Sequence, residues 1–298
     1  MNNAVVLILI MFLTACGGKI FGKASSSLVL DGTLSKLALY CAFNGTVSCV
    51  VFWFLGGFKL NINLPTAIFS AVYALLAGVS AFTLVGYKLV NVSTLTIITS
   101  TCSIVSTSFL GAFVFKENIS AASLIRIGVM VAAVMLSFFD KAKDKQKEKQ
   151  KGSLWLLVIV ILLSLAVDAG VAITTKLYTL DSRVADENSF FFFTNVFLLF
   201  FSLILFSLDS LKNRENFKSA LEMLNPKRAL ILVGNTVCSN VGSLVGILLI
   251  AIIDVSVYSP LVSALGIISG VAASLIFRQR LGALSYLAAL LACAAMFI

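Results

Sequence analysis

The sequence places one acidic residue, Asp168, near the middle of a long apolar run at 154–177. A charged side chain at the centre of a membrane helix costs at least about 2.5–3.5 kcal/mol on insertion scales, so such residues usually face a bundle interior or a wet cavity. The chemistry open to Asp168 is proton uptake and release, or direct contact with a substrate. The alternative is a structural carboxylate that pairs with Lys19 or with a neighbouring helix. Lys19 lies deep in the first apolar run, at 3–22, and either faces Asp168 or extends to the membrane interface.

A second group of candidate residues lies in the apolar run at 228–251, which contains Asn235, Thr236, Asn240 and Ser243. Thr236, Asn240 and Ser243 share one helical face, because they are spaced by four and then three residues. Amides at membrane depth need a partner, a water molecule or a ligand. Two interpretations remain open: these residues line a substrate pocket, or they make hydrogen bonds between helices.

Further polar side chains complete the set of candidate pocket residues. They are Tyr87 in the third apolar run, Ser100 and Ser103 in the fourth, and Tyr258 and Ser263 in the ninth. Each set has a structural alternative. The tyrosine of the third run suits an interfacial aromatic belt, the hydroxyls of the fourth run can bond to their own helix, and the small residues of the ninth run favour close helix packing.

The residue types that most enzymes need are scarce. The chain has no histidine, and its six cysteines all lie in apolar runs without the spacing of metal ligands. We therefore predict no catalytic residue, no metal and no cofactor, and a membrane enzyme acting on lipids is disfavoured. The net charge of +9 resides mostly in connecting segments, which argues against nucleic-acid binding.

Membrane helices must position these residues, because hydrophobic residues make up 60% of the chain and charged residues only 12%. A soluble domain carries about 25% charged residues, and a spanning helix needs about 20 apolar ones. We therefore predict an all-α membrane protein with ten transmembrane helices. The ten apolar runs cover approximately 3–22, 34–56, 66–88, 92–115, 120–139, 154–177, 187–208, 228–251, 255–277 and 282–298.

A charged segment at 140–153 divides the ten runs into two sets of five. It contains the sequence DKAKDKQKEKQK, which is too polar to be buried and predicts a solvated basic connector. The expected domains are a first five-helix repeat at 1–139 and a second at 154–298. An odd number of helices in each repeat forces the two repeats into opposite orientations across the membrane.

Two short segments match between the predicted repeats. Asn91-Val92-Ser93 resembles Asp254-Val255-Ser256, and Phe115-Lys116-Glu117-Asn118-Ile119-Ser120 lines up with Phe277-Arg278-Gln279-Arg280-Leu281-Gly282. The second match follows the fourth run of each half. With it the chain resembles the EamA-like, ten-helix branch of the drug/metabolite transporter superfamily, whose signature at that place is close to F-x-G-E-R-L-S. The resemblance implies that Glu117 is a structural cap or an anchor between loops. The chain departs from the family pattern by lacking a proline midway along the fourth and ninth runs.

The resemblance implies a secondary-active transporter that moves a small organic metabolite, an amino acid or related solute, by alternating access, with export as the expected direction. The alternative within this class is a multidrug efflux transporter, and the alternative from another class is a non-transporting membrane scaffold or subunit. The implied partners are a small-molecule substrate, membrane lipid and a coupled proton, and the chain is expected as a monomer or homodimer in the cytoplasmic membrane.

The sidedness of the chain is open at the level of sequence. Lys and Arg favour cytoplasmic segments, and their distribution places the connector in the cytoplasm and both termini outside. The family resemblance instead implies cytoplasmic termini. Near the amino terminus, Leu13-Thr14-Ala15-Cys16 resembles a lipoprotein signal but lacks a basic segment before it, so we interpret 3–22 as a membrane helix.

Overall fold

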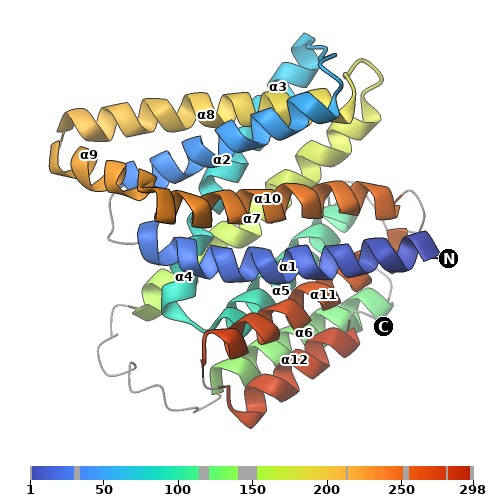
Figure 1. The fold of residues 1–298 in the computed structure, drawn as a ribbon. Helices are drawn as coiled ribbons and strands as arrows, with labels where there is room; N and C mark the ends of the chain where they lie inside the picture. The colour runs from blue at the N-terminus through green and yellow to red at the C-terminus, as the bar shows by residue number, and fades with distance from the viewer. Residues whose placement is uncertain are drawn as a thin grey trace. The chain divides into compact units, whose positions relative to one another are not determined.

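The structure is a computed structural model that describes residues 2–29, 34–113, 121–139, 153–212, 214–250, 255–279 and 281–295. These residues form helices joined by turns, without a strand among them, which confirms the predicted all-α class for this part of the chain (Figure 1). The helices before the connector are α1 (Asn2–Val29), α2 (Leu34–Leu55), α3 (Leu64–Ser80), α4 (Thr83–Leu89), α5 (Val92–Phe113) and α6 (Ala121–Phe139). Those after it are α7 (Ser153–Leu180), α8 (Glu187–Lys212), α9 (Arg214–Leu221), the 3-10 turn η2 (Glu222–Leu224), α10 (Pro226–Ile250), α11 (Val255–Ile276) and α12 (Ala283–Ala295).

Several helices have the length and composition of membrane spans. In the described residues, five are long and apolar enough to cross a membrane, within α1, α2, α7, α8 and α10. The apolar parts of α3, α5, α6, α11 and α12 are shorter. Many large apolar side chains on these helices are exposed, as expected where lipid replaces water as the solvent. The chain therefore has the helices of a membrane protein.

The predicted continuous helix at 66–88 is wrong. The structure ends α3 at Ser80, places a turn at Ala81 and Phe82, and begins the short helix α4 at Thr83. In α4, a Cβ atom added to Gly86 would lie 2.5 Å from Leu95 Cδ1, so the glycine permits close contact with the start of α5. No proline marks this break in the sequence.

The described residues form two compact units, and each combines segments from both sides of the connector. The first unit contains 1–20, 86–168 and 241–298, and the second contains 21–85 and 169–240. The division passes through α1, α4, α7 and α10. These units do not coincide with the predicted sequence repeats at 1–139 and 154–298. The existence of the repeats stays a prediction.

In the first unit, α5 packs on α11 and α6 packs on α12 (Figure 1). Their shared core includes the fully buried side chains of Ile97, Met130 and Ile267 and a set of alanines from α12. Hydrogen bonds show that α5 and α11 are antiparallel. The N–H of Ser93, at the start of α5, donates to Ser274 Oγ near the end of α11 at 2.9 Å.

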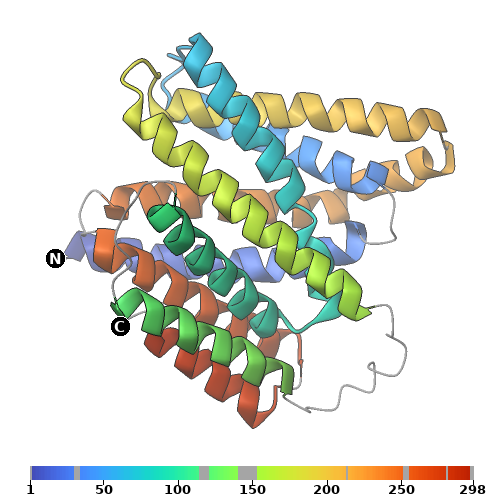
Figure 2. The same cartoon turned by 180° about the vertical axis from the view of Figure 1, so that it is seen from behind.

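In the second unit, α2 and α8 lie side by side along most of their length (Figure 2). Their direction is also antiparallel, because Ser35 at the start of α2 bonds to Asp209 near the end of α8. The rings of Phe52 and Phe191 stack between them with centroids 5.3 Å apart. Gly45 allows the two backbones to approach, since a Cβ atom there would lie 3.0 Å from the carbonyl oxygen of Asn195.

Candidate functional site

A ladder of polar side chains joins α2 and α10 within the second unit. Asn235 Nδ2 donates to the hydroxyl of Tyr40 at 2.7 Å, and Asn240 Nδ2 donates to Ser48 Oγ at 3.0 Å. Between them, Thr236 Oγ1 donates to Asn44 Oδ1. Tyr40, Asn44 and Ser48 lie on one face of α2, because residues four apart in a helix are neighbours on its surface.

Three of the predicted pocket residues take part in this ladder. Asn235, Thr236 and Asn240 are all buried and all make hydrogen bonds between helices, as the structural alternative expects. Sequence reasoning missed their partners Tyr40, Asn44 and Ser48. The same spacing of four residues on the second apolar run was the signal that could have identified them.

Asp168 and Lys19 are not joined by an ion pair. Both belong to the first unit, and neither has an ion-pair or hydrogen-bond partner within the described part of the chain. Asp168 is half-buried on α7. One turn before it, the buried Ser164 Oγ also lacks a hydrogen-bond partner among the described residues.

The surroundings of Asp168 follow from the packing of α7 on α5. Ser106 Oγ donates to the carbonyl oxygen of Leu165 at 3.0 Å, and Leu157 is buried in a cluster with Cys102. Residues 157, 161, 164 and 168 recur at the helical period, so Ser164 and Asp168 share the stripe of α7 that faces α5. Two polar groups that have no partner in the described ranges therefore lie one turn apart on the face of α7 that packs on α5.

The remaining predicted residues lie on several helices. Tyr87 is buried on α4, Ser100 is half-buried and Ser103 exposed on α5, Ser243 is exposed on α10, and Ser263 is half-buried on α11. The side chain of Tyr258 lies outside the described residues. Their role as pocket lining stays a prediction.

The matched segment after α11 has a defined structural role. Gln279 Oε1 accepts a hydrogen bond from the N–H of Val92 at 3.0 Å, which satisfies one of the free donors at the start of α5. Arg278 adopts a left-handed conformation with φ of 51°, and the N–H groups of Arg278 and Gln279 bond back to the carbonyls of Leu275 and Ser274. This is the Schellman helix end, with arginine at the position usually held by glycine. Glu117, the matched residue, lies outside the described residues.

Two turns of the second unit are tied together at one end of α3 and α8. Thr66 Oγ1 accepts from the N–H of Ala185 at 2.8 Å, and Ser189 Oγ accepts from the N–H of Asn61 at 3.0 Å. The hydroxyl of Tyr178 donates to the carbonyl of Ala185 at 2.5 Å. These bonds fix the connection between α7 and α8 to the connection between α2 and α3.

Two carboxylates in this region have lowered pKa values. The side-chain hydrogen bonds of Arg183, and then its backbone N–H, lower the pKa of Asp181 to about 2. Burial raises the pKa of Asp186, but hydrogen bonds from the side chain and N–H of Ser189 outweigh it, so the net pKa is lowered. Asp186 thereby caps the first turn of α8, where an anion is favoured.

Comparison of the sequence with models of protein families gives no match, and comparison with curated proteins gives no significant match.

Proposed function

We propose that the chain is a secondary-active membrane transporter that moves a small organic solute by alternating access. The proposed architecture is ten transmembrane helices in two inverted five-helix repeats, similar to the EamA-like branch of the drug/metabolite transporter superfamily. A twofold axis in the membrane plane relates each helix of one repeat to an antiparallel equivalent in the other. The antiparallel packing of α2 on α8 and of α5 on α11 supports this architecture, because these are equivalent spans of the two predicted repeats.

The observation that carries the proposal is the environment of Asp168. Its carboxylate lies within an apolar helix and has no cation partner in the described residues. An ionised carboxylate at membrane depth is costly, and uptake of a proton removes that cost. Protonated and ionised Asp168 give the carrier two states that differ in charge, and solute movement can be coupled to a proton gradient through such a difference.

A ligand screen tests whether the chain binds a solute at all. Purified protein in detergent is heated with amino acids, polyamines or cationic dyes, because a ligand that binds only the folded state raises the unfolding temperature. Stabilisation by an amino acid supports the metabolite carrier. Stabilisation by dyes alone favours multidrug efflux, and the absence of any stabilising ligand favours the scaffold alternative.

A matched pair of variants tests the role of Asp168. Asp168→Asn removes the titrating carboxyl, and Asp181→Asn makes the same change in the turn directly after α7. In proteoliposomes with an imposed pH gradient, Asp168→Asn should lose pH-driven uptake of the solute found in the screen, while Asp181→Asn should keep it. Wild-type coupling in Asp168→Asn would remove this residue from the mechanism.

The proposed location is the cytoplasmic membrane, with the connector at 140–153 in the cytoplasm. Lys145→Cys, in a variant whose six native cysteines are replaced, reports the side on which the connector lies. An impermeant maleimide should label it only after the cells are permeabilised. Labelling in intact cells would show that the connector lies outside the cell and would contradict the proposed orientation.

A further inference from the structure

Three aromatic side chains in the last turn of α2 and in the turn that follows it are largely exposed. The exposed fractions are 45% for Trp53, 62% for Phe54 and 57% for Phe58. Their rings nevertheless pack on one another edge to face, because the centroid of Phe58 lies 5.0 Å from that of Trp53 and 5.2 Å from that of Phe54. We call these three residues the aromatic cluster. A contiguous exposed apolar patch of this kind marks an interaction surface.

The backbone after α2 holds the aromatic cluster together. The N–H of Phe58 donates to the carbonyl of Trp53 at 3.2 Å, and the N–H of Gly57 donates to that of Phe54 at 3.1 Å. These two bonds form a Schellman helix end. This motif is often accompanied by an apolar contact between two side chains, which here are those of Phe58 and Trp53. Gly57 and Phe58 are both left-handed, with φ of 58° and 62°. A bulky residue rarely adopts this conformation, and here it belongs to the turn that brings the Phe58 ring against Trp53.

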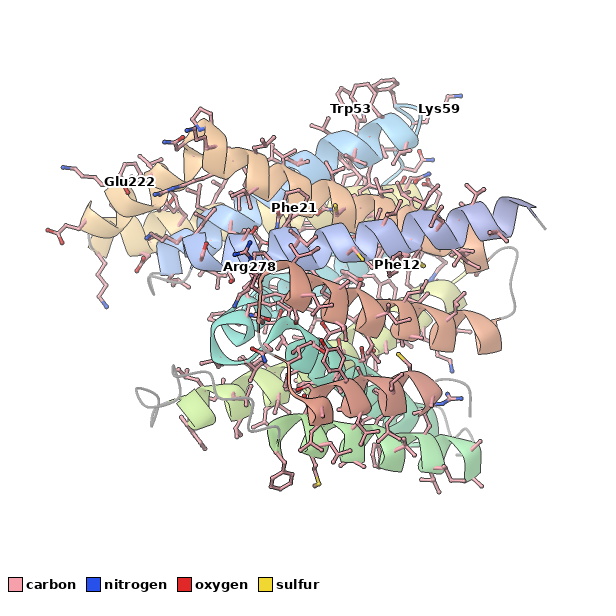
Figure 3. The ribbon with its side chains drawn as sticks, turned by 60° about the horizontal axis from the view of Figure 1, so that its bottom comes forward. Phe12, Phe21, Trp53, Lys59, Glu222 and Arg278 are labelled. Carbon is pink, nitrogen blue, oxygen red and sulfur yellow. The ribbon has the colours of Figure 1, made fainter. Side chains whose placement is uncertain are left out.

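The position of the cluster along α2 indicates what covers it. α2 has 22 residues and the composition of a membrane span, and at 1.5 Å per residue this length matches the hydrocarbon core of a bilayer, about 30 Å. The cluster continues an exposed apolar surface that includes Val50 and Leu55. The exposed cation Lys59 follows directly, and Figure 3 shows Trp53 and Lys59 at the same end of the helix. Tryptophan and lysine together are typical of the boundary between lipid and water.

We propose that the aromatic cluster and Lys59 form an interfacial anchor that binds phospholipid. The rings lie at the boundary between acyl chains and headgroups, and the ammonium group of Lys59 contacts a lipid phosphate. The anchor is joined to a rigid base, because the N–H of Asn61 bonds to Ser189 Oγ and Asn63 Nδ2 bonds to the carbonyl of Arg183. It therefore fixes the depth of this end of the second unit in the membrane.

Tryptophan fluorescence tests the anchor directly, since Trp53 and Trp155 are the two tryptophans of the sequence. Trp155→Phe leaves Trp53 as the single reporter. The variant is placed in phosphatidylcholine vesicles whose acyl chains carry bromine near the glycerol end or near the methyl end. Bromine near the glycerol end should quench Trp53 more strongly than bromine near the methyl end, and aqueous iodide should quench it less than it quenches free tryptophan amide.

A second substitution isolates the contribution of the lysine. In the single-tryptophan background, Lys59→Gln should increase quenching of Trp53 by iodide, whereas Lys227→Gln, at an exposed lysine of α10, should not. Strong iodide quenching without bromine quenching in the unsubstituted reporter would show a solvent-exposed cluster and overturn the anchor. Protection from both quenchers would show that protein, such as a second copy of the chain, covers the cluster, and would also overturn it. None of these readouts depends on transport.

Discussion

Replacing Gln279 by alanine should destabilise the first unit, because it removes the acceptor for the N–H of Val92 (3.0 Å) while Val92 itself is fully buried. A buried donor left without a partner costs about 1–3 kcal/mol. Replacing Gln279 by glutamate should have the opposite effect at neutral pH. A carboxylate at a helix N-terminus stabilises by about 0.3–1 kcal/mol, and glutamate is the residue at the matched position Glu117.

The assay is thermal unfolding in one detergent, with Gln146→Ala in the charged connector as the matched control. The gain from Gln279→Glu belongs to the ionised side chain, so it should be present at pH 7 and absent at pH 3, below the usual glutamate pKa of about 4.3. If Gln279→Ala unfolds like Gln146→Ala, the hydrogen bond to Val92 has no energetic role. If the gain from glutamate persists at pH 3, charge at the start of α5 is not its cause.

Three further predictions follow from contacts within the second unit. A double-mutant cycle with Ser48→Ala and Asn240→Ala should give a coupling free energy of unfolding of about 0.6–1.7 kcal/mol, the range for hydrogen bonds between membrane helices; zero coupling would contradict the ladder. Asp186→Ala should cost about 0.5–2 kcal/mol at pH 7 as the loss of a helix cap. Because folding lowers the pKa of Asp186, its contribution is present above about pH 4, the unfolded value, and is lost as pH falls below it; an equal cost at pH 2 and pH 7, measured by thermal unfolding, would refute this. Gly234→Ala should destabilise by about 1–3 kcal/mol through overpacking, because the new Cβ would lie 2.8 Å from the ring of Phe21; Phe21→Leu should restore much of the loss in a chemical-denaturation assay.

The helices were largely predictable because each apolar run is long and is bounded by polar residues. The predicted run at 34–56 corresponds to α2 at Leu34–Leu55, and the run at 228–251 corresponds to α10 at Pro226–Ile250. The break between α3 and α4 was not predictable from composition. Ala81 and Phe82 are compatible with a helix, and no proline or glycine marks the turn that the structure places there.

The candidate site was predictable only in part. The spacing of Thr236 and Asn240 identified a polar face on one helix, but the sequence left open whether that face meets a ligand or another helix. The bonds of Asn240 to Ser48 and of Val92 to Gln279 join residues 192 and 187 positions apart. Such pairs depend on which helices become neighbours, and hydrophobic periodicity carries no information about that choice.

The antiparallel pairs separate structural polar residues from functional candidates. Antiparallel packing places the start of one helix beside the end of another, so a side chain from the second can satisfy the free N–H groups of the first. Ser35 is satisfied in this way by Asp209, and Val92 by Gln279. In an apolar solvent every polar group needs such a partner. Asp168, a carboxylate in the middle of a helix, has no such partner within the described residues. We therefore keep it as the leading candidate for the proposed transport function.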